Sequence, residues 1–321
     1  MPLIRSLLVL GALLAAGLVA CDRDTPEPAN DTVAVLPPAE VPPPPPPPAA
    51  PSWNGWPARR AGELLIVPAA GSALRAQLVH PRLTDSTLTP TTQHDLAPLE
   101  GLEIELFSQA GLVGRAQLAA PEQGASPRGE ACTAWPTARV VPALEPVTPW
   151  TVAIEAGRAE PIPFDSVAAL SPADSARLVA AVARVASSLP QDTASGFAGL
   201  PFVVRSVRRF TPVAGREAFV ADVMRRVNQE ASQKVEHIFL VAERAAGATR
   251  APYTPVYVER SEGPEETLEL REVLAALRLG PDGPPVLVVA RDYGDGTAYA
   301  LVQRGEDRRW RAVWSSAYAG C

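Results

Sequence analysis

Short stretches of alternating apolar and polar residues recur along the chain after residue 57. Leu102, Ile104 and Leu106 alternate with glutamates, and a second apolar stretch follows Gly111, which is the pattern of a β-hairpin. Similar patterns predict further strands over residues 63–68, 73–80, 137–141 and 150–155. Prolines and glycines separate these strands, so we expect residues 58–165 to form a β-rich domain, a small sandwich or barrel.

One stretch in the second half has a clear helical pattern. Ser171 suits an N-cap and Pro172 a first helical position, and Leu178, Val182 and Val185 repeat at helical spacing. A helix is therefore predicted over residues 172–189. The spacing also favours helix slightly over strand for residues 216–229, and it indicates a short helix over residues 266–277.

The other elements expected in the second half are strands, over residues 202–207, 237–241, 256–259, 285–291, 297–304 and 309–315. Residues 286–290 are uniformly apolar, as in a strand that is buried on both faces. The chain as a whole predicts an α+β fold that is mostly antiparallel, with two or three helices. The sequence leaves open whether residues 166–321 form a separate domain or continue the preceding one.

The N-terminus has the features of an export signal. Arg5 precedes an apolar stretch of 14 residues, shorter than the roughly 20 that a membrane span needs, so an uncleaved anchor is the weaker interpretation. Leu18-Val19-Ala20-Cys21 resembles the lipobox of bacterial lipoproteins. The resemblance implies removal of residues 1–20, acylation of Cys21 and a membrane anchor on the extracytoplasmic side. It leaves open which membrane holds the lipid, and an ordinary cleaved signal is the other alternative.

Residues 21–57 carry the lipidated cysteine and a proline-rich segment. Residues 22–57 contain 13 prolines, seven of them consecutive over residues 42–48, and few large apolar residues. Such a composition predicts a disordered linker with a stiff polyproline stretch, either a spacer or a ligand for a proline-binding partner.

The cysteines and the charge restrict the setting and the partners. With Cys21 acylated, Cys132 and Cys321 remain as a pair in an oxidising compartment, which predicts a disulfide between them, although two separate buried thiols are the alternative. The net charge of −6 argues against nucleic acid as a partner.

No familiar catalytic, cofactor or zinc motif occurs, and the three histidines, His80, His94 and His237, are not clustered. The sequence therefore predicts neither enzymatic activity nor a cofactor. Asp292 and Asp295 slightly resemble part of a calcium loop, but a tight turn between two strands explains their surroundings better. Consecutive arginines such as Arg225 and Arg226, and the acidic stretch 259–272, are expected on solvated faces.

The C-terminal stretch is expected to place Trp310 and Trp314 on one face of a strand. The pair is expected to cover the core, with a ligand platform as the alternative.

These observations predict a lipid-anchored protein of the cell envelope without catalytic activity. It either binds an envelope protein or a glycan, or has a structural role. The alternatives are an exported hydrolase with an unrecognised site and a small-ligand binding lipoprotein. A deep pocket with convergent polar groups and perturbed pKa values would favour these alternatives, whereas a flat apolar patch would favour the first function.

Replacement of Cys21 tests the anchor. We expect Cys21→Ser to abolish membrane association, because the acyl chains have no other attachment point in the lipobox interpretation. Cell fractionation and labelling with a radioactive fatty acid measure this, and Cys321→Ser is the control that should keep the label. A Cys21→Ser variant that still labels and sediments with membranes would contradict the lipoprotein assignment.

Overall fold

The computed structural model describes residues 55–69, 71–83, 99–122, 132–165, 170–190, 196–227, 233–248 and 251–321. The predicted signal, Cys21 and the predicted linker up to residue 54 lie outside the described residues. Ala49–Cys321 form one compact unit. The predicted boundary between residues 165 and 166 stays a prediction.

Six antiparallel strands close into a barrel in the order β1-β2-β5-β4-β3-β6. They are β1 (Leu65–Ala69), β2 (Ser72–Val79), β3 (Glu103–Ser108), β4 (Gly111–Leu118), β5 (Thr137–Pro142) and β6 (Val152–Glu155). A short helix, α1 (Ala58–Ala61), precedes them. Alternate residues such as Ile66, Leu78 and Ile104 fill the interior of the barrel. The β-rich character predicted for this part is confirmed, and the barrel is the correct one of the two architectures.

Two further antiparallel sheets follow. The central sheet has the order β15-β14-β13-β12-β7, with β16 paired to β14, and the outer sheet has the order β11-β10-β9-β8. The central strands are β7 (Ala159–Pro161), β12 (Leu270–Leu279), β13 (Pro285–Asp292), β14 (Gly296–Arg304), β15 (Trp310–Ser315) and β16 (Ala319–Gly320). The outer strands are β8 (Val203–Phe210), β9 (Arg216–Val227), β10 (Lys234–Ala245) and β11 (Thr254–Gly263).

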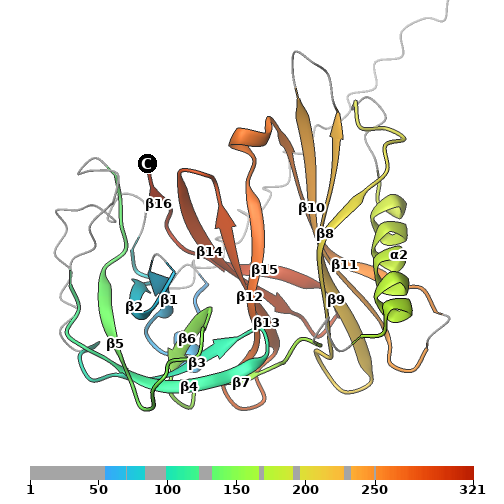
Figure 1. Cartoon of the computed structure of the whole chain (residues 1–321). Coiled ribbons are helices and arrows are strands. Elements are labelled where there is room, and N and C mark those ends of the chain that lie inside the picture. Colours follow the sequence, from blue (N-terminus) through green and yellow to red (C-terminus); the bar gives the residue numbers. More distant parts are fainter. Residues whose placement is uncertain are drawn as a thin grey trace, which may run out of the picture. The chain divides into compact units, whose positions relative to one another are not determined.

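The barrel, the central sheet, the outer sheet and helix α2 (Pro172–Ser188) follow one another as layers (Figure 1). Leu65 and Phe107 of the barrel pack against one face of the central sheet. Phe239 of the outer sheet shares a core with Leu287 on the opposite face. Helix α2 then covers the remaining face of the outer sheet through Val182 and its neighbours.

Strand β13 contributes side chains to both cores. Val286 and Val288 belong to the core with the barrel, whereas Leu287 and Val289 belong to the core with the outer sheet. All four side chains are at most 1% exposed, which confirms the prediction of a strand buried on both faces. Helix α2 is also confirmed, with Ser171 as its N-cap, whose hydroxyl accepts from the Asp174 amide.

The helices predicted over residues 216–229 and 266–277 are wrong. The first stretch forms strand β9, whose Phe219 faces α2 while Val220 faces the central sheet, so apolar residues on both faces obscured the two-residue period. The second stretch contains the one-turn 3₁₀-helix Glu265–Thr267 and most of strand β12. A register shift between Val273 and Ala275 interrupts alternation there. The fold is therefore mostly antiparallel β, and its described residues contain two α-helices.

The predicted disulfide between Cys132 and Cys321 is present, with a Cα–Cα distance of 4.6 Å. It joins the segment before β5 of the barrel to the end of β16. The Thr133 amide donates to the Gly320 carbonyl at 3.0 Å and strengthens the same connection. β16 approaches β14 so closely that a Cβ on Gly320 would lie 2.4 Å from the Gly296 Cα, so this pairing requires glycine.

We expect Cys321→Ser to lower the free energy of unfolding by about 2–5 kcal/mol, because the disulfide restricts the unfolded chain over a long loop. Urea unfolding of the exported protein measures the loss. Dithiothreitol should have the same effect on the unaltered protein, and none on a variant in which both Cys132 and Cys321 are serine. Unchanged stability in Cys321→Ser would contradict a stabilising role for this bond.

Candidate functional site

The residues that the sequence singled out do not gather at one place. Asp292 is the last residue of β13 and Asp295 lies in the tight turn before β14, which agrees with the turn interpretation. The Gly294 amide donates to Asp292 Oδ1 at 2.8 Å, and the Tyr318 hydroxyl donates to Asp295 Oδ1 at 2.5 Å. No group of three or more potential metal ligands occurs among the described residues.

Trp310 and Trp314 are both buried, which agrees with the core interpretation, but they do not share a face. Trp310 packs between the central and outer sheets, and Trp314 packs against Trp56 between the central sheet and the barrel. Ala312 pairs with Val302 and Trp314 pairs with Leu301, which leaves Val313 as an extra residue in β15. This bulge reverses the alternation, so the expectation of one shared face is wrong.

A groove forms where the barrel and both sheets meet, and we call it the junction groove. Its lining residues are Val67, Pro68, Gly71, Trp150, Thr151, Arg205, Ser206, Asp222, Leu270, Arg271, Glu272, Leu274, Ala290, Asp292, Thr297 and Tyr299. Its volume of about 590 Å³ lies within the range of about 300–1,000 Å³ that is typical of ligand sites. The groove is therefore large enough for a ligand.

The floor of the junction groove is one face of the central sheet. Glu272 pairs with Ala290, and Ala290 pairs in turn with Tyr299 on the next strand. Leu270, Asp292 and Thr297 form the adjacent row on the same face. Glu272 and Asp292 are thus diagonal neighbours, and both carboxylates are exposed.

Two strand edges border the junction groove. Strand β7 pairs with β12 at Leu277–Leu279, and the Ile162 amide adds one hydrogen bond to the Ala276 carbonyl at 2.8 Å. Pro161 and Pro163 prevent regular pairing beyond that point, because they lack an amide hydrogen. Within the described part of the chain, no strand pairs with the outer side of β12 over residues 270–276. The same holds for the outer side of β8 over residues 203–208.

Register shifts lie at both edges. In β8, the register shift leaves Arg205 without a paired residue on β9. In β12, the register shift leaves Leu274 without a paired residue on β13. A third shift occurs in β1 after Pro68. All three residues line the junction groove. Bulges of this kind redirect side chains and are common beside binding sites.

The charges of the junction groove are unevenly paired. Arg205 and Asp222 form an ion pair at 3.3 Å, and Arg271 binds Glu259 at 2.6 Å. Glu272 and Asp292 have no ion-pair partner among the residues that the structure describes. Burial, with a smaller contribution from Asp292, raises the pKa of Tyr299, so its phenol stays neutral and donates a hydrogen bond to Gln77 at 3.4 Å. The lining thus has an excess of negative charge.

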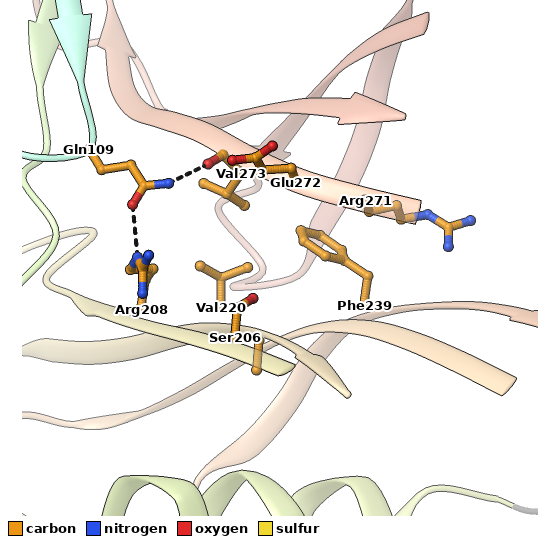
Figure 2. A pocket seen from close by; sticks show the side chains of 9 residues that line it. Gln109, Ser206, Arg208, Val220, Phe239, Arg271, Glu272 and Val273 are labelled. Atoms are coloured by element: carbon orange, nitrogen blue, oxygen red, sulfur yellow. Dashed lines mark hydrogen bonds between the residues drawn. The ribbon is translucent and has the colours of Figure 1, made fainter. Parts of the chain in front are cut away.

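A smaller chamber adjoins the groove and shares Ser206, Arg271 and Glu272 with it; its other lining residues are Gln109, Arg208, Val220, Ala221, Phe239 and Val273. Its volume is only about 80 Å³, far below the size of an ordinary ligand pocket. Figure 2 shows Gln109 of the barrel reaching across it. The Gln109 amide donates to the Val273 carbonyl at 2.9 Å and accepts from Arg208 Nε at 2.8 Å. Gln109 thus links three layers at the edge of β12.

The second backbone carbonyl at this edge is also capped by a side chain. Thr151 of the barrel donates its hydroxyl to the Leu274 carbonyl at 2.6 Å. Side chains of the barrel therefore replace a neighbouring strand here, and they hold the floor of the groove in place.

Partly buried charged groups close the inter-sheet core beside the groove. Arg271 and Arg291 of the central sheet bind Glu259 of the outer sheet, each at 2.6 Å, and the Tyr257 hydroxyl donates to the same carboxylate. Glu269 lies 3.1 Å from Arg271. Burial lowers the pKa of Arg291, but the nearby carboxylates of Glu259 and Glu269 raise it by more. The net effect is a raised pKa, so the arginine stays charged.

This cluster corrects the expectation of solvated faces. Part of the acidic stretch 259–272 is drawn into the inter-sheet cluster. Arg225 is 2% exposed and pairs with the buried Glu236 beneath Phe197 and Phe202.

The outer sheet also holds an aspartate–histidine pair. His237 Nδ1 lies 3.2 Å from Asp222 Oδ1, and both residues are buried. Ser206 pairs with Asp222 from the other side, so the aspartate stands between the serine and the histidine. Ser206 lies on β8 and His237 on β10, with β9 between them. Two strand spacings of about 4.8 Å put their backbones roughly 10 Å apart, which is too far for a nucleophile and its general base. The three residues therefore do not form a catalytic triad in this arrangement.

Comparison with known proteins gives no relative to argue from: no protein-family model, no curated protein and no solved structure matches this chain. Among the described residues, no helix is both long and apolar enough to span a membrane. The class of protein is thus defined by its own geometry, a β-barrel joined to two stacked sheets, with a groove at their junction. Sequence reasoning missed this groove because its residues come from widely separated segments. The only local signal was the Pro161-Ile162-Pro163 stretch that ends β7.

We expect Gln109→Ala to lower the free energy of unfolding by about 1–3 kcal/mol, because it leaves the Val273 carbonyl and the Arg208 guanidinium without this partner. Urea unfolding measures the change. Gln117→Ala is the matched control, since Gln117 is exposed on β4, and it should stay within about 0.5 kcal/mol of the unaltered protein. Equal effects of the two substitutions would show that Gln109 does not connect the layers.

Proposed function

We propose that this protein is a lipid-anchored protein of the cell envelope that works as a binding module, and that the junction groove holds an extended segment of a partner polypeptide. The lipobox-like sequence ending at Cys21 supports the anchor. The observation that carries the binding role is the groove itself, which runs beside two strand edges that no described strand covers. On the β12 edge, the carbonyls of Val273, Leu274 and Ala276 are already bound, and the rest of that edge is open in the described part of the chain.

The strand edges favour an extended polypeptide as the ligand. A peptide that lies along an open edge exchanges main-chain hydrogen bonds with it, and its alternate side chains enter the neighbouring groove. The regular edge of β12 before Leu274 covers residues 270–273, which corresponds to about 13 Å of extended chain. The bulges at Arg205 and Leu274 limit edge-to-edge pairing between copies of this chain.

The charge of the groove selects among such segments. Two arginines and three carboxylates line it, and Arg205 and Arg271 are already engaged by carboxylates. Glu272 and Asp292 therefore complement a lysine or arginine of the partner, as charge-assisted hydrogen bonds require. Neither a hydrolase nor a small-ligand binder gains support from the aspartate–histidine pair or from the 80 Å³ chamber.

Photo-cross-linking in intact cells tests this function. We expect a benzoylphenylalanine placed at Thr297 of the anchored protein to cross-link to a polypeptide, because Thr297 lines the groove. The combined substitutions Glu272→Gln and Asp292→Asn should lower the yield at least about tenfold, since each charge-assisted bond contributes about 1.5–3 kcal/mol.

The control places the same photo-reactive residue at Arg139, which is exposed on β5 of the barrel. An adduct at Thr297 but not at Arg139 supports the groove as the binding site. Equal adducts at the two positions, a glycan adduct, or a yield that ignores both carboxylates would each contradict the proposal.

A further inference from the structure

A second concave site lies on the opposite face of the outer sheet, between that sheet and helix α2. Two adjoining cavities of about 500 and 430 Å³ share Ala181, Arg184, Arg244 and Tyr253. We call them together the α2 groove. None of its lining residues belongs to the junction groove, so the two grooves are separate sites.

Positive charge predominates in the α2 groove. Its lining contains four arginines, Arg177, Arg184, Arg209 and Arg244, but only two carboxylates, those of Asp174 and Glu217. Walls of low polarity, including alanines of α2, strengthen the field of such charges inside a concave site. The groove therefore favours an anion over a cation or a neutral molecule.

Three of the four arginines are held in place by carboxylates. Arg244 binds both oxygens of Glu217 at 3.0 and 3.1 Å and lies 4.3 Å from the centre of the Tyr253 ring. Arg177 binds Asp174 at 2.5 Å. Arg209 binds Asp165, which lies outside the lining, at 2.5 Å. These guanidinium groups form a fixed, partly neutralised wall.

Arg184 differs from the other three. It is exposed on α2, seven residues and thus about 10 Å along the helix from Arg177, and no ion-pair or hydrogen-bond partner for it occurs among the described residues. Ala180 and Ala181 lie between these two arginines along the helix, and their short side chains leave the space open. The guanidinium group of Arg184 therefore carries an uncompensated positive charge in the same concave site as Arg244 and Tyr253.

We propose that the α2 groove is a phosphate-binding site, in which Arg184 makes the principal contact and Arg177 and Arg244 flank the anion. Arginine binds phosphate oxygens through pairs of parallel hydrogen bonds. A tetrahedral anion accepts such bonds from several directions at once, as donors on helix α2 and on strand β10 require. The phosphate group could belong to a soluble phosphomonoester or to the phosphodiester headgroup of a lipid. Both present negatively charged terminal oxygens to the arginines, three in the monoester and two in the diester.

Calorimetric titration of the full, acylated protein in detergent tests the site. The probes are inorganic phosphate, glycerol 1-phosphate as a monoester, glycerophosphoglycerol as a lipid headgroup, and acetate. In about 0.15 M sodium chloride, where the Debye length is about 8 Å, we expect a dissociation constant of about 1 mM or lower for at least one phosphate probe. The tighter of the two esters identifies the source of the phosphate.

The matched variants are Arg184→Gln and Arg139→Gln. The first should weaken phosphate binding at least about tenfold without changing thermal unfolding, because Arg184 makes no contact that folding needs, whereas the second should change neither. Binding weaker than about 1 mM for every phosphate probe, equal losses in the two variants, or acetate bound as tightly as phosphate would each overturn the assignment.

Discussion

The burial of both faces of the central sheet is the constraint on which the other layers depend. Val286 to Val289 are apolar without alternation, so neither face of β13 can be left to water. Each buried side chain of this size contributes about 1.5–3 kcal/mol when it is removed from solvent. The barrel supplies the cover on one face and the outer sheet on the other. Strand β9 of the outer sheet is likewise apolar on both faces. Helix α2 covers the face of this sheet that does not pack against the central sheet.

Buried and partly buried charged groups then determine how the two sheets are aligned. Glu259 binds Arg271 and Arg291 at one end of the shared core, and Glu243 binds Arg304 at 2.8 Å at the other end. Such pairs contribute little net stability, because desolvation offsets most of their attraction. A shift of one sheet along the other would leave these charges buried without partners, which costs several kcal/mol. The pairs therefore exclude other alignments.

The sequence was informative where one face of an element was polar, and misleading where neither was. Helix α2 and the hairpin of β3 and β4 have a clear polar side, so their periods were readable. Strands β9 and β12 lie in buried sheets, and the first lacks alternation while a bulge at Leu274 breaks the alternation of the second. A bulge at Val313 likewise separated Trp310 from Trp314. A single inserted residue in a strand reverses the direction of every later side chain, and sequence alone gave no sign of it.

Both concave sites occur where one layer stops before it has covered its neighbour, which is why residues distant in sequence build them. Strand β7 contains only Ala159–Pro161, and the prolines at positions 161 and 163 prevent it from following β12 toward residue 270. Gln109 and Thr151 satisfy two carbonyls of the exposed edge, and the rest of that edge borders the junction groove. On the far side of the outer sheet, α2 presents alanines between Arg177 and Arg184 and leaves a gap. Incomplete cover by the layers thus produces one groove with excess carboxylates and another with excess arginines, which is why the ligands proposed for the two grooves carry opposite charges.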